Sequence, residues 1–332
     1  MWKPLAHSID WLLSMTLSRF VRPRGELPRP NVVPRDPAEV TWPDAVEPRF
    51  EPAKSPAGKS PGGPAPIDEK CWEFSFASPV DSPWEECRTA RGLALGPPDA
   101  KRAVILLHGA YEDKYVHPVW MARAFTQQGY RVLIPAGPCH LERAPQGVFS
   151  GSPMFWSTDL FVAALYQWLA EVRGLIGFLR REGATQVGVF GNSLGSLVAG
   201  LAATLWSDVD FAALLSPVGS HADAIRHSRV AARIWPWMRD LSADQTALLD
   251  RWAPCRRRPL TDRLGFFITA YDNLQPTWLQ EEWWQAWGQP PRWDYPHAHL
   301  SAHYSKDFYR DLAKFAADTA ARTDHLAKPE AT

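Results

Sequence analysis

The pattern of hydrophobic and polar positions divides the chain into consecutive parts. Over residues 1–22, apolar side chains recur at helical spacing and arginines follow at the end, which predicts an amphipathic helix. Residues 23–70 are rich in proline, so we expect a linker that is flexible at least over residues 51–66. Between residues 71 and 322, short apolar runs alternate with amphipathic stretches. This alternation predicts one α/β domain, and residues 323–332 are expected to form a disordered tail.

Within the α/β domain, the periodicity predicts a mostly parallel sheet with helices on both faces. Strands are expected at residues 72–78, 87–95, 103–107, 131–134, 186–190, 211–215, 264–269 and 292–295, the first two forming a hairpin. Helices are expected at residues 118–128, 160–181, 194–206, 278–287 and 305–321. Short segments rich in Arg and Trp interrupt this alternation at residues 217–259, which predicts an inserted helical cap.

Composition narrows the possible partners. The 332 residues are 45% hydrophobic, which is enough for a sizeable core. Lys and Arg total 36, as do Asp and Glu, so no basic surface for nucleic acid is expected. The four cysteines are widely spaced and no HExxH motif occurs, so neither a metal nor a cofactor is expected. No apolar run approaches ~20 residues, and we expect a cytoplasmic protein of unknown oligomeric state.

The segment Gly191-Asn192-Ser193-Leu194-Gly195 lies between an apolar strand and a helix. A turn this tight needs small flanking residues and leaves the serine hydroxyl exposed, so the motif predicts a nucleophile at Ser193. A serine hydroxyl reacts only when a base removes its proton and an acid orients that base. The rest of the chain must therefore supply both groups.

The acid and the base are sought after the later strands. Asp272 follows the strand at 264–269, at the sheet edge where functional groups gather, with Asp208 and Asp210 as alternatives. Three histidines follow the last strand, and His299 is preferred because the apolar residue after it can hold the loop. His297 is the alternative base, while His303 is expected to enter the terminal helix.

Negative charge develops on the substrate oxygen during attack, so two backbone donors are expected. The amide of Leu194 is one, and Ala110, after the strand at 103–107, is the other. His108 is expected to brace this turn and Tyr111 to line an acyl pocket. In the cap, Pro236 prevents a regular helix between Trp235 and Trp237, and at least one of these indoles is expected to line the pocket.

These residues make the chain resemble the α/β-hydrolase superfamily over about residues 71–321. Residues 17–27, residues 141–149 and the Ser193 motif look like a poorly characterised branch that carries an N-terminal helical arm. The resemblance implies chemistry on esters, thioesters, amides or some carbon–carbon bonds, and Ser193 argues against relatives that use Asp. Ala298 stands where the family usually has Gly before the histidine, which leaves the choice between His297 and His299 open.

The expected function is a serine carboxylesterase that acts on a small molecule with a hydrophobic acyl group. An acyltransferase using the same residues, or a non-catalytic binding protein of the same fold, are the alternatives. The N-terminal helix is expected to pack on the domain, with peripheral membrane contact as the other possibility.

Overall fold

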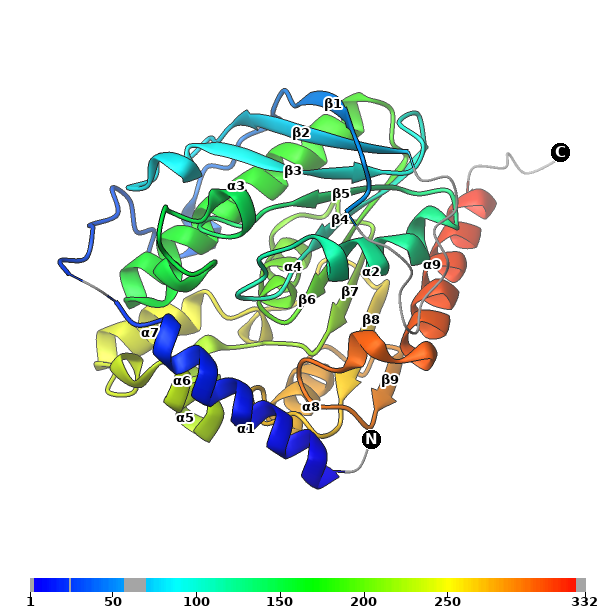
Figure 1. Ribbon diagram of the computed structural model, residues 1–332. Helices are drawn as coiled ribbons and strands as arrows, with labels where there is room; N and C mark the ends of the chain where they lie inside the picture. The colour runs from blue at the N-terminus through cyan, green and yellow to red at the C-terminus, as the bar shows by residue number, and fades with distance from the viewer. Residues whose placement is uncertain (1–2, 24, 57–69, 327–332) are drawn as a thin grey trace, which may run out of the picture.

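The computed structural model describes residues 3–23, 25–56 and 70–326. These residues form one large twisted sheet with helices packed against it (Figure 1). The strands follow the spatial order β1-β2-β3-β5-β4-β6-β7-β8-β9. The six strands from β5 to β9 in this order pair in parallel. The pairs β1–β2, β2–β3 and β3–β5 are antiparallel. The bounds are β1 Arg49–Ala53, β2 Cys71–Ala77, β3 Thr89–Leu95, β4 Arg102–Leu107, β5 Arg131–Pro135, β6 Gln186–Asn192, β7 Phe211–Leu215, β8 Leu264–Thr269 and β9 Arg292–Tyr295. The predicted mostly parallel sheet is confirmed.

Helices cover both faces of the sheet because the central strands are apolar on both sides. In β4, Val104 and Leu106 face one apolar layer, and Ile105 and Leu107 face the other. Helices α2 and α9 belong to the first layer, and α3, α4 and α8 to the second. The helices are α1 Lys3–Phe20, α2 Val116–Thr126, α3 Thr158–Arg181, α4 Leu194–Leu205, α5 His221–His227, α6 Arg229–Ile234, α7 Ala243–Arg251, α8 Thr277–Ala286 and α9 Lys306–Leu326.

Helix α3 is the one described helix with the length and hydropathy of a membrane span. Of its apolar window, 78% is buried within the molecule. Its side chains pack against the central strands in one of the two apolar layers, so the core of the fold accounts for its composition.

The proline-rich segment is more ordered than the sequence predicts. Residues 49–53 form β1, and every residue of β1 pairs with β2. Pro52 is tolerated there because β1 is an edge strand, where one side needs no backbone donor. Upstream, Val46 is buried and its amide donates to the carbonyl of Gly174 in α3. Residues 57–69, which include most of the expected flexible stretch, lie outside the described residues, as do residues 327–332 of the expected tail.

An insertion of short helices separates β7 from β8, at the place where the sequence predicts a cap. It contains α5, α6 and α7, with a break at Trp235–Pro236 where α6 ends. Helix α1 packs against α6, so the N-terminal segment crosses the front of the molecule beside the cap (Figure 1).

Candidate active site

Ser193 occupies the sharp turn between β6 and α4. Its backbone has φ 53° and ψ −118°, a strained conformation that projects the side chain from the end of the strand. The two glycines are required by close packing: a Cβ on Gly191 would collide with the carbonyl of Gly195, and one on Gly195 would collide with that of Leu107. The small residues of the motif therefore allow this turn to pack against β4.

Ser193, His299 and Asp272 form a continuous hydrogen-bonded chain. Ser193 Oγ lies 2.7 Å from His299 Nε2, and His299 Nδ1 lies 2.6 Å from Asp272 Oδ2. All three side chains are buried. The carboxylate fixes the ring so that Nε2 is directed at the serine hydroxyl and can accept its proton.

The Asp272 carboxylate is held by five donors. Its Oδ1 accepts hydrogen bonds from the backbone amides of Leu274 and Gln275, at 2.9 and 2.8 Å. Its Oδ2 accepts from Thr269 Oγ1 at 2.8 Å, from Gln280 Nε2 at 3.0 Å and from the His299 ring. Such a set of bonds orients the carboxylate with little rotational freedom.

The pKa of His299 is raised although the ring is buried. Burial disfavours the imidazolium, but the charge of Asp272 and its hydrogen bond outweigh this effect, with Asp10 adding to it. A base with a raised pKa accepts the serine proton more readily.

The alternative acids and bases lie away from this chain of bonds. Asp208 pairs with Arg173, and Asp210 pairs with Arg180 and accepts from the backbone amide of Val187. His297 Nδ1 contacts Ser301 Oγ at 3.3 Å, on the same loop. Of the candidates left open, the structure therefore joins only Asp272 and His299 to Ser193.

The two expected backbone donors, Ala110 and Leu194, line the cleft beside Ser193. Leu194 is the first residue of α4, where a backbone amide has no partner within the helix. His108 braces the turn at Ala110, as expected: it is fully buried, its Nε2 accepts from the amide of Gly137 and its Nδ1 bonds the carbonyl of Gly109.

A cavity of about 350 Å³ opens beside the serine. Tyr111 and Trp235 line it, and the Trp235 indole N–H donates to the Tyr111 hydroxyl. Trp237, the other expected pocket residue, is not among the lining residues, because its indole N–H donates to the Phe155 carbonyl and its ring packs on the core. The further apolar lining residues are Leu17, Phe149, Phe155, Val218, Ala224, Ile234, Leu274 and Leu300.

Sequence reasoning misses several residues of the site. Leu17 comes from α1, far from the elbow in sequence, and no local pattern signals its contact with the cleft. Thr269 and Gln280 bond the acid, but isolated polar residues at a strand end and in a helix carry no motif. Asp10 and Ser14 are polar residues that the structure buries on α1, and the sequence does not indicate which face of this helix packs on the domain.

The fold and this constellation define a protein of the α/β-hydrolase class, with a serine at the elbow rather than an aspartate. The model of the alpha/beta hydrolase family matches residues 104–331, more than half of the chain, and the protein belongs to that family. No protein of curated function matches it in sequence.

Solved structures share the fold at low sequence identity. The acetyl xylan esterase from Paenibacillus sp. R4 is 15% identical with a TM-score of 0.59, over 90% of this chain and 98% of that one. Acetyl xylan esterase 1 from Thermoanaerobacterium sp. JW/SL YS485 is 15% identical with a TM-score of 0.57, over 92% and 98%. The acylaminoacyl peptidase from Pyrococcus horikoshii is 13% identical with a TM-score of 0.53, over 87% and 43%. At these identities the likeness concerns the fold.

Proposed function

We propose that this protein is a serine hydrolase that cleaves carboxylic esters carrying a small hydrophobic acyl group. The observation that carries the proposal is the hydrogen-bonded chain Ser193–His299–Asp272 beside a mainly apolar cleft. The esterases among the structural neighbours support the same reaction class. The cavity volume is near the lower end of the roughly 300–1,000 Å³ common for ligand pockets, which favours a small acyl group.

In the proposed reaction, Ser193 Oγ attacks the ester carbonyl while His299 Nε2 takes its proton. The amides of Ala110 and Leu194 donate to the oxyanion that forms. His299 then gives the proton to the leaving alcohol, and the acyl group remains on Ser193. Water attacks this acyl-enzyme with His299 again acting as base, which releases the acid and restores the serine.

The decisive experiment measures hydrolysis of a panel of p-nitrophenyl esters of increasing acyl length, together with labelling by a fluorophosphonate probe. We expect activity on the shorter acyl esters and labelling at Ser193. The Ser193→Ala variant should fold normally and lose at least ~10³-fold in kcat, since only binding and the oxyanion donors remain. Full turnover by folded Ser193→Ala would refute the proposal.

A further inference from the structure

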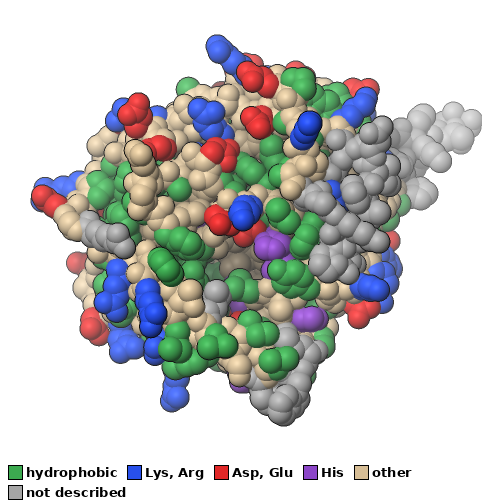
Figure 2. All heavy atoms as spheres, in the orientation of Figure 1, with side chains coloured by type: hydrophobic (Ala, Val, Ile, Leu, Met, Phe, Trp, Pro, Cys, Tyr) green, Lys and Arg blue, Asp and Glu red, His purple; other side chains and the backbone are tan. Residues whose placement is uncertain are grey.

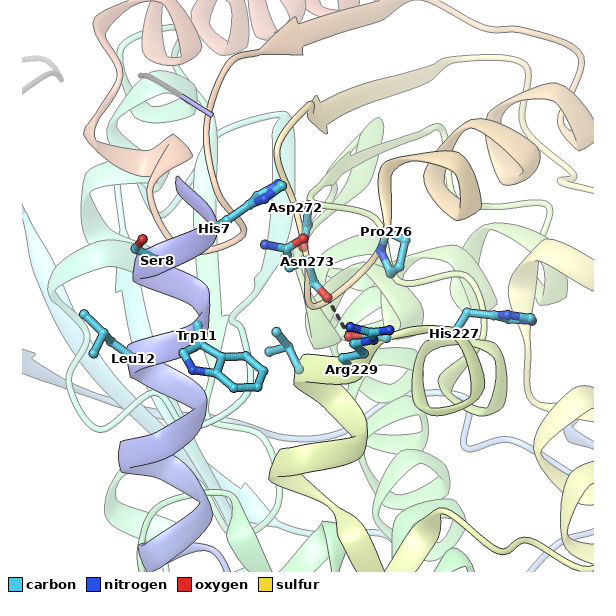
Figure 3. A pocket seen from close by; sticks show the side chains of 11 residues that line it. His7, Ser8, Trp11, Leu12, His227, Arg229, Asp272, Asn273 and Pro276 are labelled. Carbon is cyan, nitrogen blue, oxygen red and sulfur yellow. Dashed lines mark hydrogen bonds between the residues drawn. The ribbon is translucent and has the colours of Figure 1, made fainter. Parts of the chain in front are cut away.

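The N-terminal helix places a second carboxyl group beside the Asp272–His299 pair. Asp10 lies on the buried face of α1 and is only 2% exposed. Its Oδ2 accepts a hydrogen bond of 2.9 Å from the amide of Asn273, the residue that follows Asp272. Its Oδ1 is buried without a hydrogen-bond partner in the described part of the chain. Figure 3 shows α1 alongside the loop that carries Asp272 and Asn273.

The charged groups that act on Asp10 are those of the proposed site. Burial, and then the negative charge of Asp272, raise the pKa of Asp10 to about 7, while His299 opposes the rise. His7, His227 and Arg229 line the adjoining hollow between α1 and α6. Asp10 and the Asp272–His299 pair are therefore electrostatically linked.

We propose that Asp10 is a positioning residue for the Asp272–His299 pair. This inference rests on the proposed function. By accepting from Asn273, Asp10 holds the loop that carries the acid, and its negative charge favours the imidazolium that forms when Ser193 attacks. The N-terminal arm is on this view part of the active site rather than an appendage.

Two substitutions separate these effects. Asp10→Asn retains a side-chain oxygen for Asn273 but carries no charge, so we expect the acid limb of the kcat/KM–pH profile to move to lower pH, by up to about one unit. Asp10→Ala removes both, and we expect a loss on the order of tenfold in kcat with little change in KM. Ser14→Ala is the matched control, because Ser14 is also buried on α1 but its hydroxyl bonds only Trp11 of the same helix.

If the kcat/KM–pH profile of Asp10→Asn coincides with the profiles of wild type and Ser14→Ala, Asp10 does not position the pair. Fluorophosphonate labelling of the wild type keeps this result separate from the proposed function. If wild type is labelled at Ser193 and Asp10→Asn has an unchanged profile, only the inference about Asp10 fails. If wild type is not labelled, the proposed function fails first.

A second, independent feature is the outer face of α1. Large hydrophobic side chains are exposed there by 38–63%. Leu5, Leu12 and Met15 recur at helical spacing on the side opposite Asp10, and Trp11 and Phe20 lie at the two edges of this face. In Figure 2, hydrophobic and basic side chains lie along the part of the surface where α1 runs in Figure 1. A face this apolar, adjacent to cations, is typical of helices that bind at a membrane interface.

The cations come from the cap rather than from α1 alone. Arg229, Arg233 and Arg239 join Arg22 around a hollow beside α1, and the Arg233 guanidinium lies 4.8 Å from the centroid of the Trp11 ring. The acidic side chain on α5, Asp223, is already paired with arginines. The charge beside the apolar face is therefore positive.

We infer that α1 and these arginines form a docking surface for a bilayer that contains anionic phospholipid. The apolar side chains would enter the interface and the arginines would contact the headgroup phosphates. The sequence alone offered too few cations for this partner, because those of the cap lie more than 200 positions away. Docking would also bring the cleft, lined by Leu17 of the same helix, close to the membrane.

The experiment is co-sedimentation of the whole chain with phosphatidylcholine vesicles, with and without phosphatidylglycerol. We expect binding only to the vesicles with phosphatidylglycerol, and weaker binding at high salt. Leu12→Glu should lower the affinity about tenfold or more. Leu260→Glu changes a leucine of similar exposure whose backbone bonds Ala203 near the end of α4, and it should not lower the affinity. No sedimentation by wild type, equal loss in both variants, or a dimer in solution that Leu12→Glu dissociates would each overturn the inference.

Discussion

At the scale of single residues, the His299 ring is fixed from both sides, by Asp272 at Nδ1 and by Ser193 at Nε2. Among the described residues, none forms a hydrogen bond with His303 Nε2, and burial lowers the pKa of His303 to about 3. Two histidines four positions apart thus differ in chemistry, because one faces a carboxylate and the other faces apolar surroundings and other imidazoles.

Replacing each histidine tests which of them is the base. His299→Ala is expected to be as damaging as Ser193→Ala, at ~10³-fold or more in kcat, because the serine proton then has no acceptor. His297→Ala is the matched control on the same loop and should retain most of the activity. Steady-state kinetics on the preferred ester measures both variants. An inactive His297→Ala together with an active His299→Ala would reject the assignment of His299 as the base.

The pH profile should report the same ring. Attack needs the neutral imidazole, so kcat/KM is expected to fall as pH drops through the pKa of His299, which Asp272 holds above the usual value. Asp272→Asn removes that stabilisation, so the acid limb should move to lower pH while kcat falls by ~10³–10⁴. An acid limb that does not move in Asp272→Asn would contradict this account.

At the scale of elements, the elbow depends on contacts between main chains. Gly195→Ala is expected to lower the free energy of unfolding by about 3 kcal/mol or more, because its Cβ meets the Leu107 carbonyl. Gly147→Ala is the control: it has φ 74° but no atom within 4 Å of the new Cβ, so the cost should be only about 1 kcal/mol. Chemical denaturation measures both, and equal losses would show that crowding at the elbow is unimportant.

The cap tryptophans provide a matched pair on one element. Trp235→Phe opens space in the cleft and removes the hydrogen bond to Tyr111, so we expect the preferred acyl length to increase. Trp237→Phe removes a hydrogen bond to the Phe155 backbone, but the Trp237 ring does not line the cleft, so the change should lower the melting temperature without changing the acyl preference. Rates across the ester panel distinguish them, and an unchanged preference in Trp235→Phe would mean that this ring only holds the cap.

At the scale of the whole molecule, a buried ion pair joins separate layers. The Arg143 guanidinium donates to both carboxylate oxygens of Glu171 in α3, and to the carbonyls of Ala136 and Cys87. Both side chains are completely buried. The pair thus connects the loop after β5 with α3 and with the antiparallel edge of the sheet.

Removing one partner should leave the other as an isolated buried charge. Arg143→Met is expected to lower the free energy of unfolding by about 3–5 kcal/mol, and the double variant with Glu171→Leu should recover part of this loss. Lys314→Met, which breaks an exposed pair with Asp318, should have no measurable effect. Thermal melting compares the three variants. If Arg143→Met is as stable as wild type, the buried pair is dispensable for stability.

The sequence by itself determined the sheet, most element positions and the candidate residues Ser193, Asp272 and His299, because local periodicity and a tight turn express these features over short stretches. It did not reveal β1, since an edge strand tolerates proline once a partner strand is present. Tertiary structure alone decided between His297 and His299, excluded Trp237 from the cleft and brought Asp10 beside Asp272. These outcomes depend on contacts between residues far apart in the chain, whose distances no local pattern encodes.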